Sequence, residues 1–487
     1  MFAFSANAIM AAIMTKQTAA QTTSLQTIRD LLGPSGWIDD ATDMAPYLVE
    51  HRGLFQGACA GIARPATADE VAGVLAICAK VGICVTPQGG NTGLVGGGVP
   101  LYTDRCGIVL ATERLNKIRE IDPLNQTMTV EAGVILADIQ QAARDSGLLF
   151  PLSLGAEGSC RIGGNLATNA GGVQVLRYGN ARDLVLGLEV VLADGRKWDG
   201  LSALRKDNTG YDLKHLFMGS EGTLGIITAC VLKLYALPKH QETALCAAAD
   251  APAVLELFRR VRDAVGDGLT AFEIINRFAF EITVQHIENC TDPFDEHHGQ
   301  YALLETGGMG KDLRETLETV LGQALEDGII ADAVIAESGA QAQDLWRLRE
   351  TIPEAQKYEG ASIKHDVAVP VSSVPDFLAR ATALVEGALP GIRVCAFGHA
   401  GDGNIHFNLS QPVDMAGETF LDMWKDFNRQ IHDLVMQMDG SFSAEHGIGM
   451  LKRDDLALYK SDVEIDLMRQ IKQTLDPDGI LNPGKVL

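Results

Sequence analysis

Two stretches near the C-terminal end hold residue types that suit metal chemistry. The first, FGHAGDGNIHFNL, contains His399 and His406, and the second, SAEHGIG, contains Glu445 and His446. Two imidazoles and one carboxylate form a ligand set of catalytic zinc sites, in which the open coordination position takes water or substrate. The two stretches together therefore predict a metal site with a further histidine beside it.

The spacing of His399 and His406 indicates how they would share one ion. An Asp-Gly dipeptide between them is a strong signal for a two-residue hairpin turn. With the turn centred there, the histidines face each other with Cβ atoms roughly 5 Å apart, and Asn408 projects from the same face. An ordinary cross-strand pair of histidines is the alternative, but Glu445 favours the metal site. Zinc is the first expectation and manganese the second.

Length and composition bound the class of protein. With 487 residues the chain should form two or three domains. The formal net charge of −23 excludes a nucleic-acid partner, because binding to phosphates needs a basic face. The nine cysteines include no CxxC pair, which is typical of reduced thiols in a cytoplasmic protein. No later stretch resembles a transmembrane helix.

The apolar N-terminal stretch MFAFSANAIMAAIM is expected to be a frayed tail. It is too short to cross a bilayer. It also lacks the basic start of a signal peptide, because its first lysine is Lys16 and its first arginine is Arg29. The alternative is that translation begins at Met14, so that residues 1–13 do not belong to the native protein.

Two neighbouring segments predict a helix and a strand that lead into a loop. TADEVAGVLAICAKVG predicts an amphipathic helix, because Thr67 and Glu70 form a capping box and Gly82 follows the last apolar position. GICVTP then predicts a buried strand. After Pro238 the glycine content falls and longer helices alternate with strands. There AQDLWRLRETIPEAQKY predicts a helix and ASIKHDVAVP a strand.

The loop after the predicted strand is unusually rich in glycine. Six of the ten residues 89–98 are glycine, and ordering such a loop costs much backbone entropy. Glycine is retained where backbone N–H groups must approach a ligand closely, most often a diphosphate. The chain has neither the GxGxxG fingerprint nor the lysine of a P-loop. The alternative is that the glycines only form tight turns. Two further glycine-rich runs, at 154–172 and 219–228, make this alternative less favourable.

Several segments resemble one flavoprotein superfamily. PQGGNTGLVGGGVP, GSCRIGGNLATNAGG, KDNTGYDLKHLFMGSEGTLGIIT and ILNPGK resemble the FAD-binding half of the vanillyl-alcohol-oxidase/PCMH superfamily. GHAGDGNIH and AEHGIG resemble its FAD-linked-oxidase C-terminal half. Within it the sequence is most similar to D-2-hydroxyglutarate and D-lactate dehydrogenases. The resemblance implies an α+β fold: a PCMH-type FAD-binding domain of two α+β subdomains, and an α+β substrate domain. The predicted boundaries are 1–40 (tail and first helix), 41–240 (FAD-binding), 241–445 (substrate and metal) and 446–487 (a segment returning to the flavin).

The resemblance also implies which residues contact FAD. Some relatives bind the flavin covalently through a histidine just after the Gly-Gly pair, where this chain has Asn91, so a non-covalent flavin is expected. The residues assigned to FAD are Pro87, Gln88, Gly89, Gly90, Asn91, Thr92, Gly93, Leu94, Gly155, Gly158, Ser159, Gly163, Gly164, Asn165, Asn169, Gly172, Gly222, Ile226 and Asn482.

Residues matching the catalytic groups of the family imply the reaction. His399, His406 and Glu445 match its metal ligands, and His446 matches its general base. A D-2-hydroxy acid would bind the metal through its carboxylate and hydroxyl, and the ion would lower the hydroxyl pKa. His446 would take the proton while a hydride passes from C2 to FAD, which gives the 2-oxo acid. A loop histidine that only caps or hydrates is the alternative for His446.

Two cations indicate a dicarboxylate substrate. Arg349 offers two parallel donors for a carboxylate, and Lys364 matches a lysine that the hydroxyglutarate enzymes use for substrate. The alternative is that each pairs with a local acid. Asn408 and His446 are the other residues assigned to substrate binding. Pro353 stands where those enzymes carry a substrate-binding threonine. D-2-hydroxyglutarate is therefore narrowly favoured over D-lactate and over a broad D-2-hydroxy acid specificity that includes glycolate.

The expected partners follow from this reaction. Besides the substrate, the enzyme needs a non-NAD electron acceptor, which would be an electron-transfer flavoprotein, a quinone or a cytochrome. The expected location is the cytoplasm, with peripheral attachment to a membrane through the acceptor as the alternative. A homodimer is the default expectation for assembly.

Overall fold

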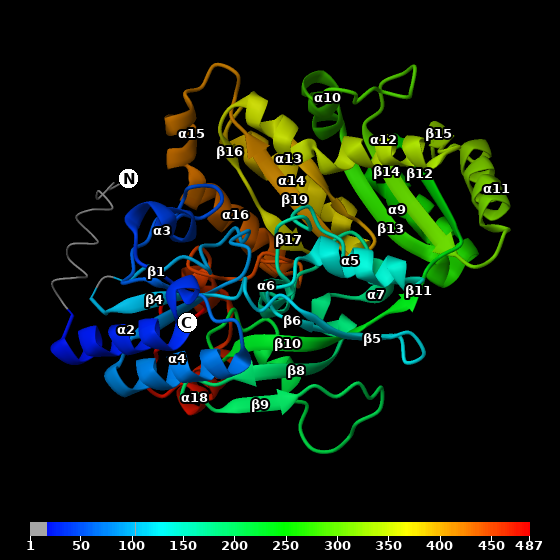
Figure 1. Cartoon of the computed structure of the whole chain (residues 1–487). Helices are drawn as coiled ribbons and strands as arrows, with labels where there is room; N and C mark the ends of the chain where they lie inside the picture. Colours follow the sequence, from blue (N-terminus) through cyan, green and yellow to red (C-terminus); the bar gives the residue numbers. More distant parts are fainter. Residues whose placement is uncertain (1–16, 103) are drawn as a thin grey trace. The chain divides into compact units, whose positions relative to one another are not determined.

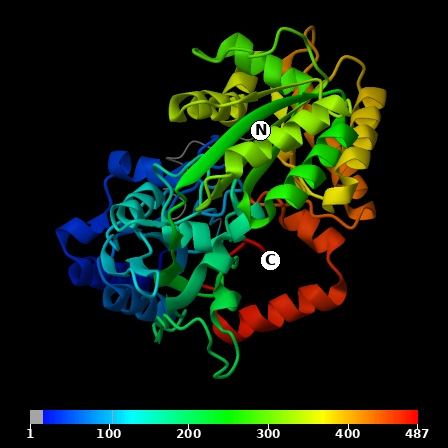
Figure 2. The same ribbon diagram turned by 90° about the vertical axis from the view of Figure 1, so that its right-hand side faces the viewer.

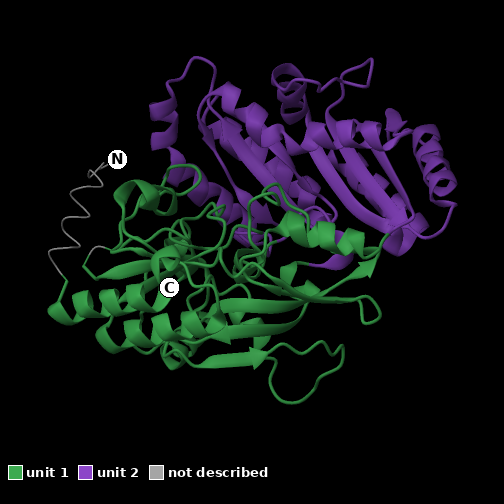
Figure 3. Ribbon diagram, in the orientation of Figure 1, with its two compact units in different colours: residues 1–170, 180–237, 445–487 green, residues 171–179, 238–444 purple. Residues whose placement is uncertain are grey.

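The computed structural model describes residues 17–102 and 104–487 (Figure 1). The N-terminal stretch predicted to be a frayed tail lies outside these residues. The chain forms two compact units (Figure 3). Unit 1 consists of Met1–Ala170, Asn180–Leu237 and Glu445–Leu487, and unit 2 of Gly171–Gly179 and Pro238–Ala444. The boundaries predicted from the sequence fall after residues 240 and 445, and the segment Gly171–Gly179 falls within the predicted FAD-binding domain.

The first part of unit 1 is a small sheet with parallel strands. Its elements are α2 (Ala19–Leu32), η1 (Pro34–Gly36), β1 (Trp37–Ile38), α3 (Ala41–Leu48), β2 (Ile62–Ala63), α4 (Ala68–Val81), β3 (Cys84–Gln88) and β4 (Gly107–Ala111). The strand order is β1-β2-β4-β3, with β4 parallel to both β2 and β3. Apolar residues of α2 and α4 form a core with this sheet.

The helix predicted from TADEVAGVLAICAKVG is confirmed as α4. Thr67 accepts a hydrogen bond from the backbone N–H of Glu70, and Gly82 adopts the left-handed conformation at the end of the helix. The predicted capping box is only half formed. The Glu70 carboxylate accepts from the N–H of Ala66 at 2.6 Å, one residue before the cap, so the reciprocal bond to Thr67 is replaced.

The second part of unit 1 is an antiparallel sheet in the order β5-β6-β10-β8-β9. Its strands are β5 (Ile118–Asp122), β6 (Thr127–Glu131), β8 (Val185–Val191), β9 (Lys197–Gly200) and β10 (Ile226–Lys233). The other elements here are α5 (Leu136–Asp145), β7 (Leu148–Leu149), α6 (Ile162–Ala167), η2 (Ala181–Leu184), α8 (Lys214–Phe217) and β11 (Tyr235–Ala236). The glycine-rich runs lie after β3, around α6 and before β10.

The C-terminal segment completes unit 1. It contains α17 (Arg453–Tyr459) and α18 (Asp462–Leu475), and Figure 2 shows α18 in red, after which the chain turns back into the unit. Leu481 forms a parallel bridge to Val85 of β3 and packs in the core of the first sheet. The last residues of the chain therefore adjoin the strand from which the first glycine-rich loop emerges.

Unit 2 is built on one eight-stranded sheet in the order β15-β12-β14-β13-β18-β19-β16, with β17 paired to β19. Its strands are β12 (His240–Ala248), β13 (Leu269–Asn276), β14 (Gln300–Gly308), β15 (Asp332–Ile335), β16 (Ser362–Ile363), β17 (Asp366–Ala368), β18 (Arg393–His399) and β19 (Asn404–Ser410). Its helices are α7 (Val175–Tyr178), α9 (Ala251–Val265), η3 (Gly266–Gly268), α10 (Arg277–His286), α11 (Leu313–Glu326), α12 (Gly339–Glu350), α13 (Ile352–Ala355), η4 (Gln356–Glu359), η5 (Val371–Ser373), α14 (Val374–Ala388), α15 (Gly417–Asp422) and α16 (Trp424–Gln437).

The sheet of unit 2 is buried on both faces. Along β12, Ala244 and Cys246 pack into one apolar cluster, and Leu245 and Ala247 pack into another. The first cluster includes α9, α11, α14 and α16, and the second includes α10 and α12. Because side chains alternate along a strand, a strand covered on both sides reads as a continuous apolar run. Within the described part of the chain, no helix has the length and apolar character needed to cross a membrane.

The hairpin that carries the two predicted metal ligands differs from its prediction. The two-residue turn is wrong: His399 pairs with Asn404 and Phe397 pairs with His406, so the loop is Ala400–Gly403. The N–H groups of Asp402 and Gly403 both donate to the His399 carbonyl, at 3.2 and 3.0 Å. Gly403 has φ 85° and packs so closely on the backbone that follows β17 that a Cβ would lie 2.1 Å from the carbonyl oxygen of Val369. His399 and His406 still share a face, because Phe397 lies two positions before His399.

Candidate flavin and metal sites

A cavity of unit 1 is formed by the glycine-rich runs and the loop that carries His446. The residues that line it come from the loop after β3, from α6, and from the segment before β10. It contains many residues that the sequence assigns to FAD, namely Pro87, Gln88, Gly89, Gly90, Asn91, Thr92, Gly93, Gly163, Gly164, Asn165, Gly222 and Ile226.

The residues of this cavity leave both space and a polar acceptor for a cofactor such as FAD. A Cβ added at Gly93 or Gly164 would meet no atom within 4 Å, so side chains there would fill the cavity instead of the ligand. At Gly90 a Cβ would lie 2.2 Å from the Ser159 carbonyl oxygen, so glycine is needed for the two loops to approach each other. The Oδ1 of Asn165 is buried with no hydrogen-bond partner among the described residues. It is an acceptor available to a ligand hydroxyl.

Asn91 fastens the first glycine-rich loop to the end of α3. Its Nδ2 donates to the carbonyl oxygens of Pro46 and Val49, at 3.1 and 2.8 Å, and its backbone is left-handed with φ 54°. An asparagine tolerates this conformation better than most residues. The side chain is thus used within the protein, which supports the prediction of a non-covalent flavin.

We expect the flavin to leave the denatured protein. Precipitation with acid should release FAD to the supernatant and leave a colourless pellet, because the amide side chain of Asn91 cannot form the histidyl bond. The absorbance spectra of the supernatant and the redissolved pellet measure this. Flavin that stays with the pellet would contradict the prediction.

The remaining predicted FAD contacts lie outside this cavity. Gly158 and Ser159 line a neighbouring cleft, and Gly172 belongs to unit 2. Asn169 accepts a hydrogen bond from the N–H of Arg182 at 3.0 Å. Asn482 donates from Nδ2 to the carbonyls of Gly97 and Glu221, at 3.0 and 2.8 Å, and so ties two loops of the cavity together. Leu94 and Gly155 are also not among the lining residues. Their contacts with FAD stay predictions.

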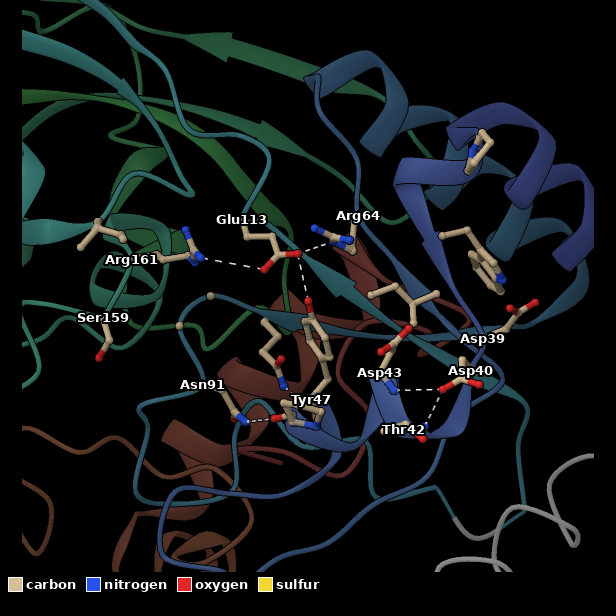
Figure 4. Close-up of a pocket in the computed structure, with 18 of the residues that line it drawn as sticks. Asp39, Asp40, Thr42, Asp43, Tyr47, Arg64, Asn91, Glu113, Ser159 and Arg161 are labelled. Atoms are coloured by element: carbon tan, nitrogen blue, oxygen red, sulfur yellow. Dashed lines mark hydrogen bonds and ion pairs between the residues drawn. The ribbon is translucent and has the colours of Figure 1, made fainter.

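The neighbouring cleft, of about 890 Å³, shares Gly89, Gly90 and Asn91 with the cavity (Figure 4). Glu113 at its centre accepts from the Tyr47 hydroxyl at 2.9 Å and from Arg64. Arg161 forms a longer ion pair with the same carboxylate, at 3.9 Å. Burial and the adjacent Glu113 raise the pKa of Tyr47 to about 12. The central charges of this cleft are paired within the protein.

Three predicted metal ligands come together at the end of the hairpin. The rings of His399 and His406 lie with their centroids 5.8 Å apart. Glu445 follows Ala444, whose N–H donates to the Asp366 carbonyl at 3.3 Å. The potential ligand atoms of His399, His406 and Glu445 all lie within 4.8 Å of one another. This donor set fits a divalent ion such as Zn²⁺. The potential ligand atoms of a second group, Asp366, Glu445 and His446, also lie within 4.8 Å of one another.

Glu273 supports the predicted metal site and was missed by the sequence reasoning. Its side chain is fully buried in β13, and its Oε1 lies 2.6 Å from Nδ1 of His399. Because a carboxylate accepts, Nδ1 carries the proton, and Nε2 is the nitrogen that would bind a metal. Burial acts to raise the pKa of Glu273, but His399 and Arg349 outweigh it and hold the pKa well below its ordinary value. The available signal was a lone acid within the apolar strand LTAFEIIN.

We expect the substitution Glu273→Gln to weaken metal binding about 10- to 100-fold, because it removes the carboxylate that orients His399. Titration of metal-free protein with Zn²⁺ in a calorimeter measures the dissociation constant. Glu242→Gln is the control, since Glu242 forms an ion pair with Arg314 elsewhere in unit 2. Equal affinities in the two variants would contradict the assigned role.

Arg349 is held by the same carboxylate. Its Nε donates to Oε2 of Glu273 at 2.7 Å, and its guanidinium lies 4.7 Å from the ring centroid of Phe397. Glu273, not a neighbour in α12, is thus its acidic partner. No other acceptor among the described residues bonds Arg349, so both Nη groups remain available to a ligand carboxylate.

The other predicted substrate residues lie around the same hairpin. The single strand predicted from ASIKHDVAVP is interrupted and forms β16 and β17 instead. Lys364 lies between these two strands and is half-buried. Asn408 is buried and donates from Nδ2 to the Gln356 Oε1 at 3.1 Å. Pro353 stands in the first turn of α13, where the missing N–H of proline is tolerated. The roles of these residues in substrate binding stay predictions.

Comparisons with known proteins agree with this architecture. Residues 59–199 match the FAD binding domain family, and residues 237–486 match the C-terminal domain of FAD linked oxidases. Among solved structures, p-cresol methylhydroxylase has the same fold, with a TM-score of 0.77 over 96% of this chain and 97% of that chain at 18% identity. The predicted combination of a PCMH-type FAD-binding domain with an α+β C-terminal domain is confirmed.

Relatives with greater sequence similarity lie in one enzyme group. D-2-hydroxyglutarate dehydrogenase from Xanthomonas citri pv. viticola is 40% identical over 87% of this chain and 88% of that protein. The mitochondrial D-2-hydroxyglutarate dehydrogenase from Rattus norvegicus is 39% identical over 93% of this chain and 83% of that protein. The D-2-hydroxyglutarate–pyruvate transhydrogenase from Saccharomyces cerevisiae is 35% identical over 91% of this chain and 90% of that protein. The chain therefore belongs to the FAD-linked oxidase family, as its glycine-rich runs and its histidine motifs indicate.

Proposed function

We propose that this protein is an FAD-dependent dehydrogenase that oxidises D-2-hydroxyglutarate to 2-oxoglutarate and passes the electrons to an acceptor other than NAD. The observation that carries the proposal is the group His399, His406 and Glu445. His446 directly follows Glu445 in the chain, and it lines the cavity that contains the predicted FAD contacts. The similarity to D-2-hydroxyglutarate dehydrogenases, 40% in one case, supports this substrate.

The glycine-rich cavity would hold FAD, and His399, His406 and Glu445 would hold a metal ion, with zinc favoured over manganese. When bound, FAD accepts the hydride from C2 of the substrate, and the ion's positive charge favours loss of the hydroxyl proton. These tasks leave the protein to bind the carboxylates, to orient the substrate and to receive the proton.

The residues of the chain divide this work. His446 acts as general base and takes the hydroxyl proton on its imidazole. The two free Nη groups of Arg349 suit one carboxylate of the substrate, because a guanidinium can donate two parallel hydrogen bonds to it. Lys364 would supply a second cation. Glu273 acts indirectly, because it orients both His399 and Arg349.

Anaerobic flavin reduction tests the proposal. The purified protein should be yellow, and D-2-hydroxyglutarate should bleach it in the absence of oxygen. A panel of D-lactate, glycolate and D-2-hydroxyglutarate, compared by the second-order rate constant of reduction, identifies the substrate. Colourless protein that takes up no FAD, or flavin that none of these acids reduces, would contradict the enzyme assignment.

D-lactate, or a broad range of D-2-hydroxy acids that includes glycolate, is the second candidate substrate class. One residue favours it: Pro353 provides no hydroxyl where the resembling enzymes carry a substrate-binding threonine. A hydrogen bond to a charged group contributes about 1.5–3 kcal/mol. Its loss would therefore weaken the preference for D-2-hydroxyglutarate over other D-2-hydroxy acids.

The proposed electron acceptor is an electron-transfer flavoprotein, a quinone or a cytochrome. The proposed location is the cytoplasm, and the proposed assembly is a homodimer.

A further inference from the structure

Glu221 is a buried carboxylate beside the predicted flavin cavity that the reaction described above does not use. Only 7% of the residue is exposed, and it lines the same cavity as His446. Its backbone has φ 52°, a left-handed conformation that is uncommon for a residue with a long side chain. Strained backbone of this kind is retained where the surroundings fix it and often serves function.

The carboxylate holds the backbone that directly follows His446. Oε1 accepts from the N–H of Ile448 at 2.7 Å, and Oε2 accepts from the N–H of Gly449 at 2.8 Å. Hydrogen bonds to a charged acceptor are about twice as strong as neutral ones. A Cβ at Gly447, where φ is 77°, would lie only 2.8 Å from Oε1, so glycine permits this close approach.

The backbone of Glu221 is itself fixed on both sides. Its N–H donates to the Ala167 carbonyl at 2.8 Å, and its carbonyl accepts from Nδ2 of Asn482, also at 2.8 Å. Burial raises the pKa of Glu221 above its ordinary value and outweighs Lys485 and Lys452, which act to lower it. Lys485 is itself buried. It is 2% exposed, and its Nζ has no hydrogen-bond partner among the described residues. Burial lowers the pKa of Lys485 to about 8, although Glu221 raises it. The backbone of Glu221 is thus held on both sides, and its carboxylate is a fixed support for the loop.

We propose that Glu221 is a positioning residue for His446: it binds two consecutive N–H groups of the loop and thereby sets where the imidazole stands in the flavin cavity. The inference rests on the proposed function, because it assigns His446 as the base. Glu221 need not contact the substrate. Its effect passes through the peptide bonds between residues 446 and 449.

The first test measures the anchoring itself and is independent of activity. Hydrogen exchange followed by mass spectrometry should show faster exchange of a peptide that covers residues 445–452 in Glu221→Gln than in the unsubstituted protein. Glu189→Gln is the matched control, because Glu189 is also a buried carboxylate of unit 1 but bonds Arg119 and Thr228. Unchanged protection of the loop in Glu221→Gln would overturn the proposal.

The second test measures the consequence for the reaction. Glu221→Gln should lower the limiting rate of anaerobic flavin reduction by D-2-hydroxyglutarate about 10-fold or more, with unchanged KM and unchanged FAD affinity, while Glu221→Asp should recover part of the rate. A wild-type rate in Glu221→Gln, or a loss explained entirely by weaker FAD binding, would overturn the positioning role. Failure of the unsubstituted protein to react with any 2-hydroxy acid would instead refute the proposed function, and the exchange experiment still decides the anchoring.

Gly447→Ala provides a second variant that keeps the carboxylate. The added Cβ would collide with Oε1 of Glu221, so the rate of flavin reduction should fall in the same way as in Glu221→Gln. If Glu221→Gln does not fold, Gly447→Ala tests the positioning role of Glu221 in its place. A folded Gly447→Ala protein with an unchanged rate and unchanged exchange in its loop would overturn the proposal.

Discussion

His446→Ala is expected to reduce the rate of flavin reduction by D-2-hydroxyglutarate between about 100- and 10,000-fold, the usual contribution of a positioned general base. FAD binding should change little, because His446 lines the cavity beside many backbone groups that contact the cofactor in the proposal. Anaerobic stopped-flow absorbance measures the limiting rate, and fluorescence titration measures FAD affinity. The loss should therefore appear in the limiting rate and not in the amount of bound flavin.

His215→Ala is the matched control for this experiment. His215 also belongs to unit 1, but 46% of its side chain is exposed and it is absent from the lining of the flavin cavity. Its replacement should leave the rate near that of the unsubstituted protein. A His446→Ala protein that reacts as fast as the control would remove the general base from the proposal.

Removal of the metal is expected to have an equally large effect. An ion that polarises the substrate oxygen contributes several kcal/mol, which corresponds to about a 1,000-fold change in rate or more. Protein treated with a chelator should bind FAD but should not be bleached by D-2-hydroxyglutarate, and added Zn²⁺ or Mn²⁺ should restore the reaction. The metal that restores the higher rate at equal occupancy identifies the preferred ion.

His399→Ala tests the same site by removal of one predicted metal ligand. The variant should lose metal, as measured by elemental analysis, and should keep its flavin. His240→Ala is the control in unit 2, because His240 belongs to neither candidate metal group. Undiminished flavin reduction in metal-free protein or in His399→Ala would show that the histidine pair is not catalytic.

Local sequence signals predicted much of the fold correctly. The limits of α4 follow from Thr67 and Gly82, because caps act within a few residues of the helix ends. The glycine-rich runs also gather at one cavity as expected, since glycine spacing reports where loops approach each other closely. Long motifs supported the family assignment, which the comparisons confirm.

Other features depend on contacts between distant segments and were not predictable. The Asp-Gly signal favours a two-residue turn, but the hairpin forms the longer loop Ala400–Gly403, in which Gly403 packs closely against Val369, the residue that follows β17. Glu273 is distant in sequence from both His399 and Arg349. The pairing of β13 with β18 brings it to His399, and α12 brings Arg349 to the same carboxylate. The same holds for Glu221, whose bonds to Ile448 and Gly449 join segments more than two hundred residues apart.

The parallel bridge between Leu481 and Val85 has a consequence for biosynthesis. Together with Asn482, which bonds Gly97, it means that unit 1 is completed by residues that are synthesised after all of unit 2. A nascent chain that has emerged only as far as residue 240 lacks this closing strap and the Glu445–Leu487 segment. Unit 1 therefore reaches its complete fold only after the whole of unit 2 has been synthesised, and a truncation that removes Leu481 should destabilise unit 1.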